Sequence, residues 1–335
     1  MKRGVAVLLA GICLAHGMPA CAEDSVPLVL EAKIPLGNVR GRIDHFAIDL
    51  ARRRLYVAEL GNDSVGVLDL NSGRVLQTIT GLREPQGVGY AASSDTLYVS
   101  NAGDGSVRLY KGADLSASGR IDLGDDADNI RIDSRRNGVL VGYGSGALAV
   151  IDPASNKKIS DISLKAHPEG FQLAEAGAKV VVNVPDARQI AVIDVASGQQ
   201  TAVAPPEGAR SNFPMAVDED QHRVLVVFRR PPLLSAFDSR DGRPLSNVET
   251  CGDADDVFVD SRRHRVYVSC GDGVIDILAD RGARYERVAR IPTSSGARTS
   301  LFVPEIDRLY VAVRATISEP AAVWVFRPSD GGSNP

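Results

Sequence analysis

The pattern that decides the fold is contained in Thr96-Leu97-Tyr98-Val99-Ser100-Asn101-Ala102-Gly103-Asp104-Gly105-Ser106-Val107. A short apolar strand with an aromatic residue near its centre is followed by a turn rich in glycine, asparagine and aspartate, and then by another apolar strand. Aspartate and asparagine hydrogen-bond to nearby backbone groups and glycine adopts positive φ, so these residues favour tight turns. The stretch therefore predicts two antiparallel strands joined by a hairpin.

The central strand of this pattern occurs seven times along the chain. Its centres are Tyr56, Tyr98, Leu140, Val181, Leu225, Tyr267 and Tyr310. Successive centres are 42, 42, 41, 44, 42 and 43 residues apart. A period in the low forties with only β-strand signals is typical of a β-propeller with one four-stranded blade per repeat. We therefore predict an all-β protein that forms a single seven-bladed β-propeller.

The two ends of the repeat region predict how the ring closes. The seventh repeat lacks an outer strand, because only the polar residues 329–335 follow its third strand. The stretch 26–36 belongs to no blade of its own, and its segment 32–35 resembles 289–292, the outer strand of blade six. We expect this N-terminal strand to complete blade seven, since ring closure removes exposed strand edges. The propeller then spans residues 23–328, and 329–335 form a disordered polar tail.

The first 22 residues have the composition of a secretory signal peptide. Lys2 and Arg3 precede an apolar run over 5–15, and Ala20-Cys21-Ala22 fits a cleavage site. The apolar run is too short to span a membrane, and no later run is long enough. We expect export to the periplasm after cleavage near Glu23. A lipoprotein acylated at Cys21 is the alternative, which the poor lipobox of residues 18–20 disfavours.

Composition excludes several classes of protein. The chain has 335 residues, of which 44% are hydrophobic and 24% charged, which is typical of a globular protein and not of a disordered or fibrous one. A formal net charge of −4 argues against general nucleic-acid binding. The sequence contains no Cys-x-x-Cys-His, Gly-x-Ser-x-Gly or Gly-x-x-x-x-Gly-Lys motif, so covalent c-type haem, a nucleophile elbow and a phosphate-binding loop are not expected.

The repeated motifs resemble those of a known family. The Leu-Tyr-Val strand, the segment Asn-x-Gly-Asp-Gly-Ser-Val at 101–107 and the segment Val-x-Asp-x-x-Ser-Gly at 67–73 are similar to the YVTN-type, YncE-like family of exported bacterial β-propellers, whose repeats are WD40-like. The resemblance covers nearly the whole mature chain and implies the propeller fold. It leaves the function open, because the family includes binding proteins as well as lactonase-like relatives.

Aligning the seven repeats indicates where a functional site would form. Positions eleven, twelve and fourteen residues before the strand centres mark the entry to each innermost strand, and in a propeller these entries surround the mouth of the central channel. Polar candidates at these positions are Asp44, His45, Asp128, Asn129, His167, Glu169, Asp255, Asp256 and Arg298. We expect them to converge at one mouth. The basic stretch 229–232 on the same face is interpreted as a solvated loop.

This set of residues supports several interpretations. We favour a non-enzymatic scaffold that binds a small polar ligand, a cation or a periplasmic partner protein, with the propeller as a monomer. A divalent cation such as calcium would use the oxygens of Asp44, Asp128, Glu169 and Asp255. Alternatively, a lactonase-like or lyase-like enzyme would polarise a carbonyl with a metal or Arg298 and move a proton with His45 or Glu169. A purely structural role for the carboxylates is the remaining alternative.

Two cysteines remain after removal of the signal peptide. Cys251 lies in the loop that enters blade six, and Cys270 ends the second strand of the same blade. Both positions fall on the mouth face of adjacent strands, and exported proteins retain disulfides. We therefore predict a Cys251–Cys270 disulfide, with two buried free thiols as the alternative.

Overall fold

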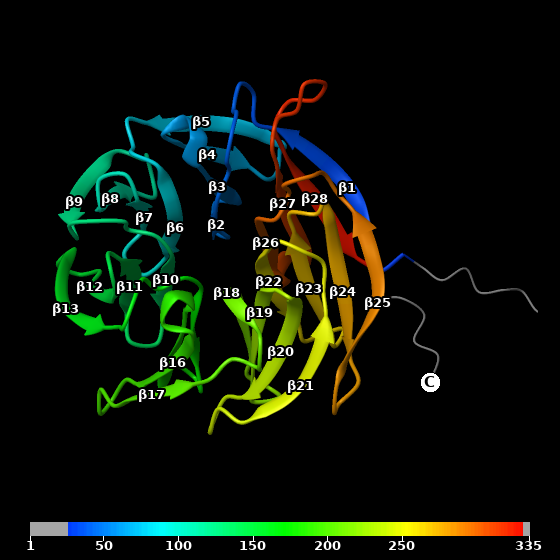
Figure 1. Ribbon diagram of the computed structural model, residues 1–335. Helices are drawn as coiled ribbons and strands as arrows, with labels where there is room; N and C mark the ends of the chain where they lie inside the picture. The colour runs from blue at the N-terminus through cyan, green and yellow to red at the C-terminus, as the bar shows by residue number, and fades with distance from the viewer. Residues whose placement is uncertain (1–25, 331–335) are drawn as a thin grey trace, which may run out of the picture.

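The computed structural model describes residues 26–330, which form seven four-stranded antiparallel sheets arranged in a ring (Figure 1). In six of the sheets the strands pair in sequence order, and the seventh contains the two ends of this segment. The prediction of an all-β, seven-bladed propeller is confirmed.

The first four blades follow the chain from residue 46 to residue 203. Blade one contains β2 (Phe46–Asp49), β3 (Arg54–Glu59), β4 (Ser64–Asp69) and β5 (Arg74–Thr80). Blade two contains β6 (Pro85–Ala91), β7 (Thr96–Asn101), β8 (Ser106–Lys111) and β9 (Ala117–Asp122). Blade three contains β10 (Ile130–Asp133), β11 (Gly138–Tyr143), β12 (Ala147–Asp152) and β13 (Lys157–Ser163). Blade four contains β14 (Phe171–Ala174), β15 (Lys179–Val184), β16 (Gln189–Asp194) and β17 (Gln200–Val203).

The remaining blades complete the ring. Blade five contains β18 (Arg210–Asp218), β19 (Arg223–Arg230), β20 (Pro232–Asp238) and β21 (Pro244–Glu249). Blade six contains β22 (Ala254–Asp260), β23 (Arg265–Cys270), β24 (Val274–Asp280) and β25 (Tyr285–Pro292). Blade seven contains β26 (Ser300–Val303), β27 (Arg308–Val313), β28 (Ala322–Pro328) and β1 (Leu28–Pro35). Three short 3-10 helices, η1 (Leu60–Asn62), η2 (Pro185–Ala187) and η3 (Pro304–Ile306), lie in turns.

The N-terminal strand β1 closes the ring, as the sequence predicted. It pairs antiparallel with β28, with Leu28 opposite Pro328 and Pro35 opposite Ala322, and Figure 1 shows the two strands side by side. Leu28 is buried in a cluster with Tyr267 of blade six, and Ile34 is buried in a cluster with Phe46 of blade one. The predicted signal peptide (1–22) and the end of the predicted tail (331–335) lie outside the described residues.

The aromatic residue at the strand centre explains why the repeat is visible in the sequence. Tyr56 of blade one is fully buried and belongs to a hydrophobic cluster that includes Val88 and Val99 of blade two. Tyr310 of blade seven packs in the same way in a cluster with Phe46 of blade one. Because each blade needs a large apolar side chain to fill the space toward the next blade, the centre position retains an apolar residue in every repeat.

Blade six contains the predicted disulfide. Cys251 and Cys270 are bonded, with their Cα atoms 5.9 Å apart, and both residues are buried. The bond joins the loop that enters β22 to the end of β23, so it fixes the start of the innermost strand of this blade.

Among residues 26–330, no helix is long and apolar enough to cross a membrane.

Candidate functional site

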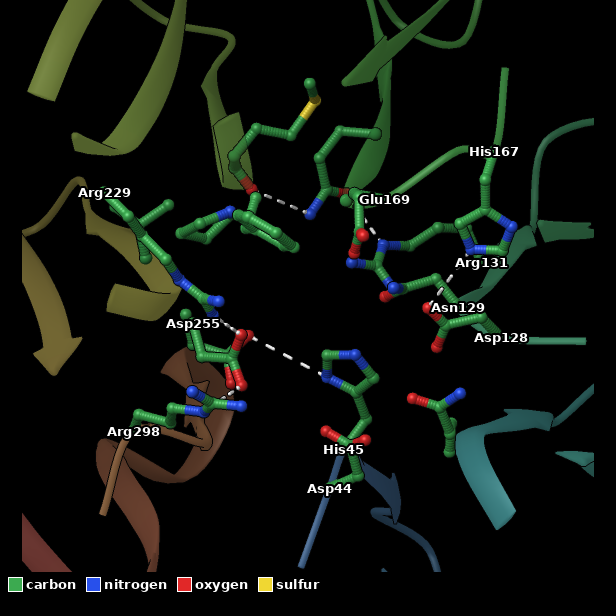
Figure 2. Close-up of a pocket in the computed structure, with 18 of the residues that line it drawn as sticks. Asp44, His45, Asp128, Asn129, Arg131, His167, Glu169, Arg229, Asp255 and Arg298 are labelled. Carbon is green, nitrogen blue, oxygen red and sulfur yellow. Dashed lines mark hydrogen bonds and ion pairs between the residues drawn. The ribbon is translucent and has the colours of Figure 1, made fainter. Parts of the chain in front are cut away.

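All nine candidate residues line a single cavity of about 260 Å³ at the mouth of the channel (Figure 2). They come from blades one, three, four, six and seven: Asp44, His45, Asp128, Asn129, His167, Glu169, Asp255, Asp256 and Arg298. The repeat alignment therefore located the residues that meet. Their role in binding remains a prediction.

A repeated backbone pairing places these side chains at equivalent positions. In blade one, the amide of Asp44 donates to the carbonyl oxygen of Ala58 (2.7 Å), and the amide of Ala58 donates to His45 (3.0 Å). The same two bonds join Asp128 and Asn129 to Gly142 in blade three, and join Glu169 and Gly170 to Asn183 in blade four. Since this pairing extends the ladder between the first two strands, it presents one residue per blade to the channel mouth.

On one side of the cavity, two arginines share the carboxylates of blade six. Nε of Arg298 lies 2.9 Å from Oδ2 of Asp255, and its Nη1 donates to both oxygens of Asp253 (2.8 and 2.7 Å). Arg229 contacts Asp255 through Nη2 and lies 3.5 Å from Asp253 through Nε. Arg229 also lies over the ring of Phe213, 4.0 Å from its centroid. These carboxylates are thus neutralised within the protein.

On the opposite side, carboxyl groups of blades three and four surround His167. Its Nδ1 donates to the carbonyl oxygen of Gly144 (2.6 Å) and lies 3.6 Å from Oδ2 of Asp126, whereas its Nε2 lies 4.0 Å from Oδ2 of Asp128. The carboxylate of Asp128 raises the pKa of His167 to about 9, helped by the Gly144 carbonyl, so the imidazole is cationic at neutral pH. Burial, reinforced by the charge of Asp128, raises the pKa of Glu169 to about 7.

The floor of the cavity combines a histidine with two buried carboxyls. Nδ1 of His45 lies 4.0 Å from Oδ1 of Asp256, whose Oδ2 accepts the amide hydrogen of Ser300 (2.7 Å). Burial raises the pKa of Asp256 to about 7 and that of Asp44 to about 6. Burial lowers the pKa of His45, but the surrounding carboxylates outweigh it and the net shift is upward. Several groups here therefore change protonation near neutral pH.

Arg131 and Gln172 also line the cavity, and the sequence analysis missed them. Both lie nine residues before their strand centres, so extending the count from eleven to nine would have found them. Arg131 donates to the carbonyl oxygen of Ile130 (2.8 Å) and to Oε1 of Gln172 (3.3 Å). Among the described residues no carboxylate forms an ion pair with Arg131, and burial lowers its pKa.

Arg229 corrects one interpretation of the sequence. The stretch 229–232 was expected to be a solvated loop, but Arg229 is the penultimate residue of strand β19, and its side chain is only 16% exposed. Its guanidinium turns into the cavity because Asp255 and the Phe213 ring provide partners there. Arg42, whose Nη2 lies 2.8 Å from Oδ2 of Asp44, also lines the cavity.

The four carboxylates proposed as calcium ligands do not form a common centre. Within residues 26–330, no group of three or more histidine, cysteine, aspartate or glutamate side chains is placed to coordinate a metal ion. Asp44 and Asp255 are ion-paired with arginines, whereas Asp128 and Glu169 lie on the other side of the cavity.

The raised pKa of Glu169 predicts how its replacement will depend on pH. A carboxyl whose pKa is raised on folding binds its proton more tightly in the folded state, so its contribution to stability falls as pH rises from about 4.5 to about 7. At about 1.4 kcal/mol per pKa unit, the full effect is at most about 3 kcal/mol. We therefore expect the free energy of unfolding of Glu169→Gln to rise relative to that of the wild type as the pH increases from 4.5 to 8.

Urea denaturation of both proteins at several pH values measures this difference. Glu305→Gln is a matched control, because Glu305 lies in η3, away from the residues that line the cavity. A stability difference between Glu169→Gln and wild type that stayed constant with pH would contradict the assigned pKa.

Comparison with solved structures supports the fold. A chain in "Crystal Structure of Mitotic Checkpoint Complex" superposes with a TM-score of 0.74 at 14% sequence identity, over 96% of this chain and 98% of that one. A chain of Kuenenia stuttgartiensis hydrazine synthase gives a TM-score of 0.69 at 16% identity, over 85% and 97% of the two chains. Similarity at these identities shows the propeller fold alone. No family model matches the chain, and no curated protein matches it.

Proposed function

We propose that this chain is an exported binding protein of the YVTN-type, and that its channel mouth recognises a small polar ligand. The observation that carries the proposal is the set of buried polar atoms at the cavity that have no hydrogen-bond partner among the described residues. They include Nε of Arg42 and Oδ1 of Asp128. Oδ2 of Asp44 and Nε of Arg298 also lack a well-directed hydrogen bond, but each lies within ion-pair distance of an oppositely charged group. An unsatisfied buried polar atom costs about 1–3 kcal/mol, so a ligand that bonds to these atoms gains affinity by relieving that cost.

Thermal unfolding with a panel of amines, carboxylates, sugars and amino acids tests the proposal. We expect at least one compound to raise the melting temperature in a saturable way, because a ligand at a hundred times its Kd adds about 2.7 kcal/mol of stability. The shift should disappear in Asp128→Asn and persist in Asp161→Asn, whose carboxylate is on the outer strand β13. A panel without any such compound would contradict ligand binding and favour a structural carboxylate ring.

A lactonase-like or lyase-like activity is the second candidate. It is favoured by one observation, the proximity of His45 to Asp256, whose pKa of about 7 suits proton transfer near neutral pH. Arg298 is a weaker candidate for polarising a carbonyl, because its guanidinium is already bonded to Asp253 and Asp255. Turnover of a lactone panel that is lost in His45→Gln would favour this function over simple binding.

Export is supported by the buried disulfide, since such bonds persist in oxidising compartments. The mass of the protein purified from the periplasm tests the predicted cleavage near Glu23 and distinguishes it from acylation at Cys21. A mass that retained residues 1–22 would contradict both.

A further inference from the structure

The cavity contains two near-copies of one acidic segment on different blades. Asp126 and Asp128 of blade three lie fourteen and twelve residues before their strand centre, as do Asp253 and Asp255 of blade six. The two pairs are therefore equivalent in the ring, and their surroundings can be compared position by position.

In blade six, the neighbouring blades supply the positive charge. Arg298 lies twelve residues before the strand centre of blade seven and reaches both Asp253 and Asp255. Arg229 lies four residues after the strand centre of blade five and reaches the same pair. Two guanidinium groups thus balance two carboxylates.

In blade three, both of these positions lack an arginine. Glu169 occupies the position in blade four that Arg298 occupies in blade seven, and Ala102 occupies the position in blade two that Arg229 occupies in blade five. His167 is the cation that contacts the blade-three pair among the described residues. The carboxyl group of Glu169 therefore faces the blade-three pair, whereas the guanidinium of Arg298 faces the blade-six pair.

Within residues 26–330, Oδ1 of Asp128 and the carboxyl group of Glu169 also lack hydrogen-bond donors. Asp128 is 7% exposed, and its buried Oδ1 atom has no hydrogen-bond partner in residues 26–330. No side chain or amide in the same range donates to the carboxyl group of Glu169, which lines the cavity beside it (Figure 2). Donors from a ligand would satisfy both groups.

From this asymmetry we infer that the cavity binds a small organic cation whose ammonium or guanidinium group donates hydrogen bonds to Asp128 and Glu169. At the blade-three pair, the ligand group would occupy the place that the guanidinium of Arg298 occupies beside the blade-six pair. This inference rests on the proposed binding function and specifies the chemical class of its ligand. Charge-assisted hydrogen bonds to carboxylates are about twice as strong as neutral ones, which favours a charged donor over a hydroxyl group.

The rest of the cavity suits a short aliphatic chain attached to the cationic group. Phe213, Pro214 and Met215 form an apolar portion of the lining, and the volume of about 260 Å³ admits a small molecule. A ligand carboxylate has a less favourable environment, because Arg42, Arg229 and Arg298 are already paired with carboxylates. Arg131 is the position at which an anionic ligand would bind instead.

Isothermal titration calorimetry with four probes tests the inference on the mature protein. Agmatine and n-butylamine carry the required cations, whereas n-butanol and butyrate are the neutral and anionic comparators. We expect both cations to bind at least about tenfold more tightly than either comparator, the ratio that corresponds to one hydrogen bond to a charged group. Asp128→Asn should weaken agmatine binding by at least about tenfold.

Two further variants keep the test independent of folding defects. Glu169→Arg installs the residue of the equivalent position in blade seven, so it should abolish agmatine binding and raise the melting temperature. Asp253→Asn is the matched control in the balanced pair, and it should change agmatine affinity by less than about threefold.

Proton release provides a second readout. Glu169 is faced by Asp128, His167, Asp255 and Arg229, and burial together with Asp128 raises its pKa to about 7. A bound cation stabilises the carboxylate, so binding at pH 6.5 should release a proton and tighten as the pH rises to 8. Titrations in buffers with different ionisation enthalpies measure this release.

The outcomes separate the two proposals. Binding of butyrate in preference to n-butylamine, or of a sugar from the wider panel, would overturn the cation and leave the binding function intact. Binding of calcium without binding of agmatine or n-butylamine would likewise overturn it in favour of a metal. Absence of binding by the four probes and by the whole panel would overturn both.

Discussion

Deleting residues 26–36 is expected to cause the largest loss of stability of any change considered for this protein. The segment contains three buried side chains, Leu28, Ile34 and Leu36, and each contributes about 1.5–3 kcal/mol when buried. The deletion also exposes the edge of β28, which now pairs with β1. The sum is comparable with the total stability of an ordinary domain, so the shortened chain should unfold or aggregate at 37 °C.

Urea denaturation and size-exclusion chromatography measure this effect. The double variant Leu28→Ala with Ile34→Ala provides a milder test on a chain of full length, with an expected loss of about 4 kcal/mol or more in the free energy of unfolding. Leu30→Ala is the matched control, because Leu30 lies in the same strand and is 41% exposed. A double variant as stable as this control would contradict the role of β1 in closing the ring.

Removing the disulfide is expected to have the second largest effect. Replacing Cys251 and Cys270 together by alanine frees a loop whose ends are 19 residues apart, and the chain-entropy model assigns about 3 kcal/mol to closing such a loop. The expected result is a lower urea midpoint for the double variant than for the oxidised wild type.

Dithiothreitol supplies the control for this experiment. It should lower the midpoint of the wild type toward that of the double variant and leave the double variant unchanged. Equal midpoints for the oxidised wild type and the double variant would contradict a stabilising role.

The fold could be predicted from the sequence because the same strand pattern occurs seven times along the chain. Each strand centre fills the same space toward the next blade, as Tyr56 and Tyr310 show, so the packing requirement produces a visible period. The positions that surround the mouth follow from the same period, because one backbone pairing presents Asp44, Asp128 and Glu169 in turn.

The ion pairs within the site could not be predicted in this way. The ion pair of Arg229 could not be predicted because its long side chain reaches from the end of β19 to a carboxylate of another blade. The repeat period gives the position of a residue along the chain but not the direction in which a long side chain extends. Arg131 occupies a periodic position, but in blades one and two that position contains Ala47 and Gly89. A deviation in one repeat becomes meaningful only when its neighbours across the channel are known.

The pairing of β1 with β28 also constrains when the protein can finish folding. During synthesis β1 emerges about three hundred residues before its partner β28, since Leu28 faces Pro328. Until then blade seven has no complete sheet and the ring stays open. The chain therefore remains incompletely folded throughout its translation, and the ring closes only after the last strand has been synthesised.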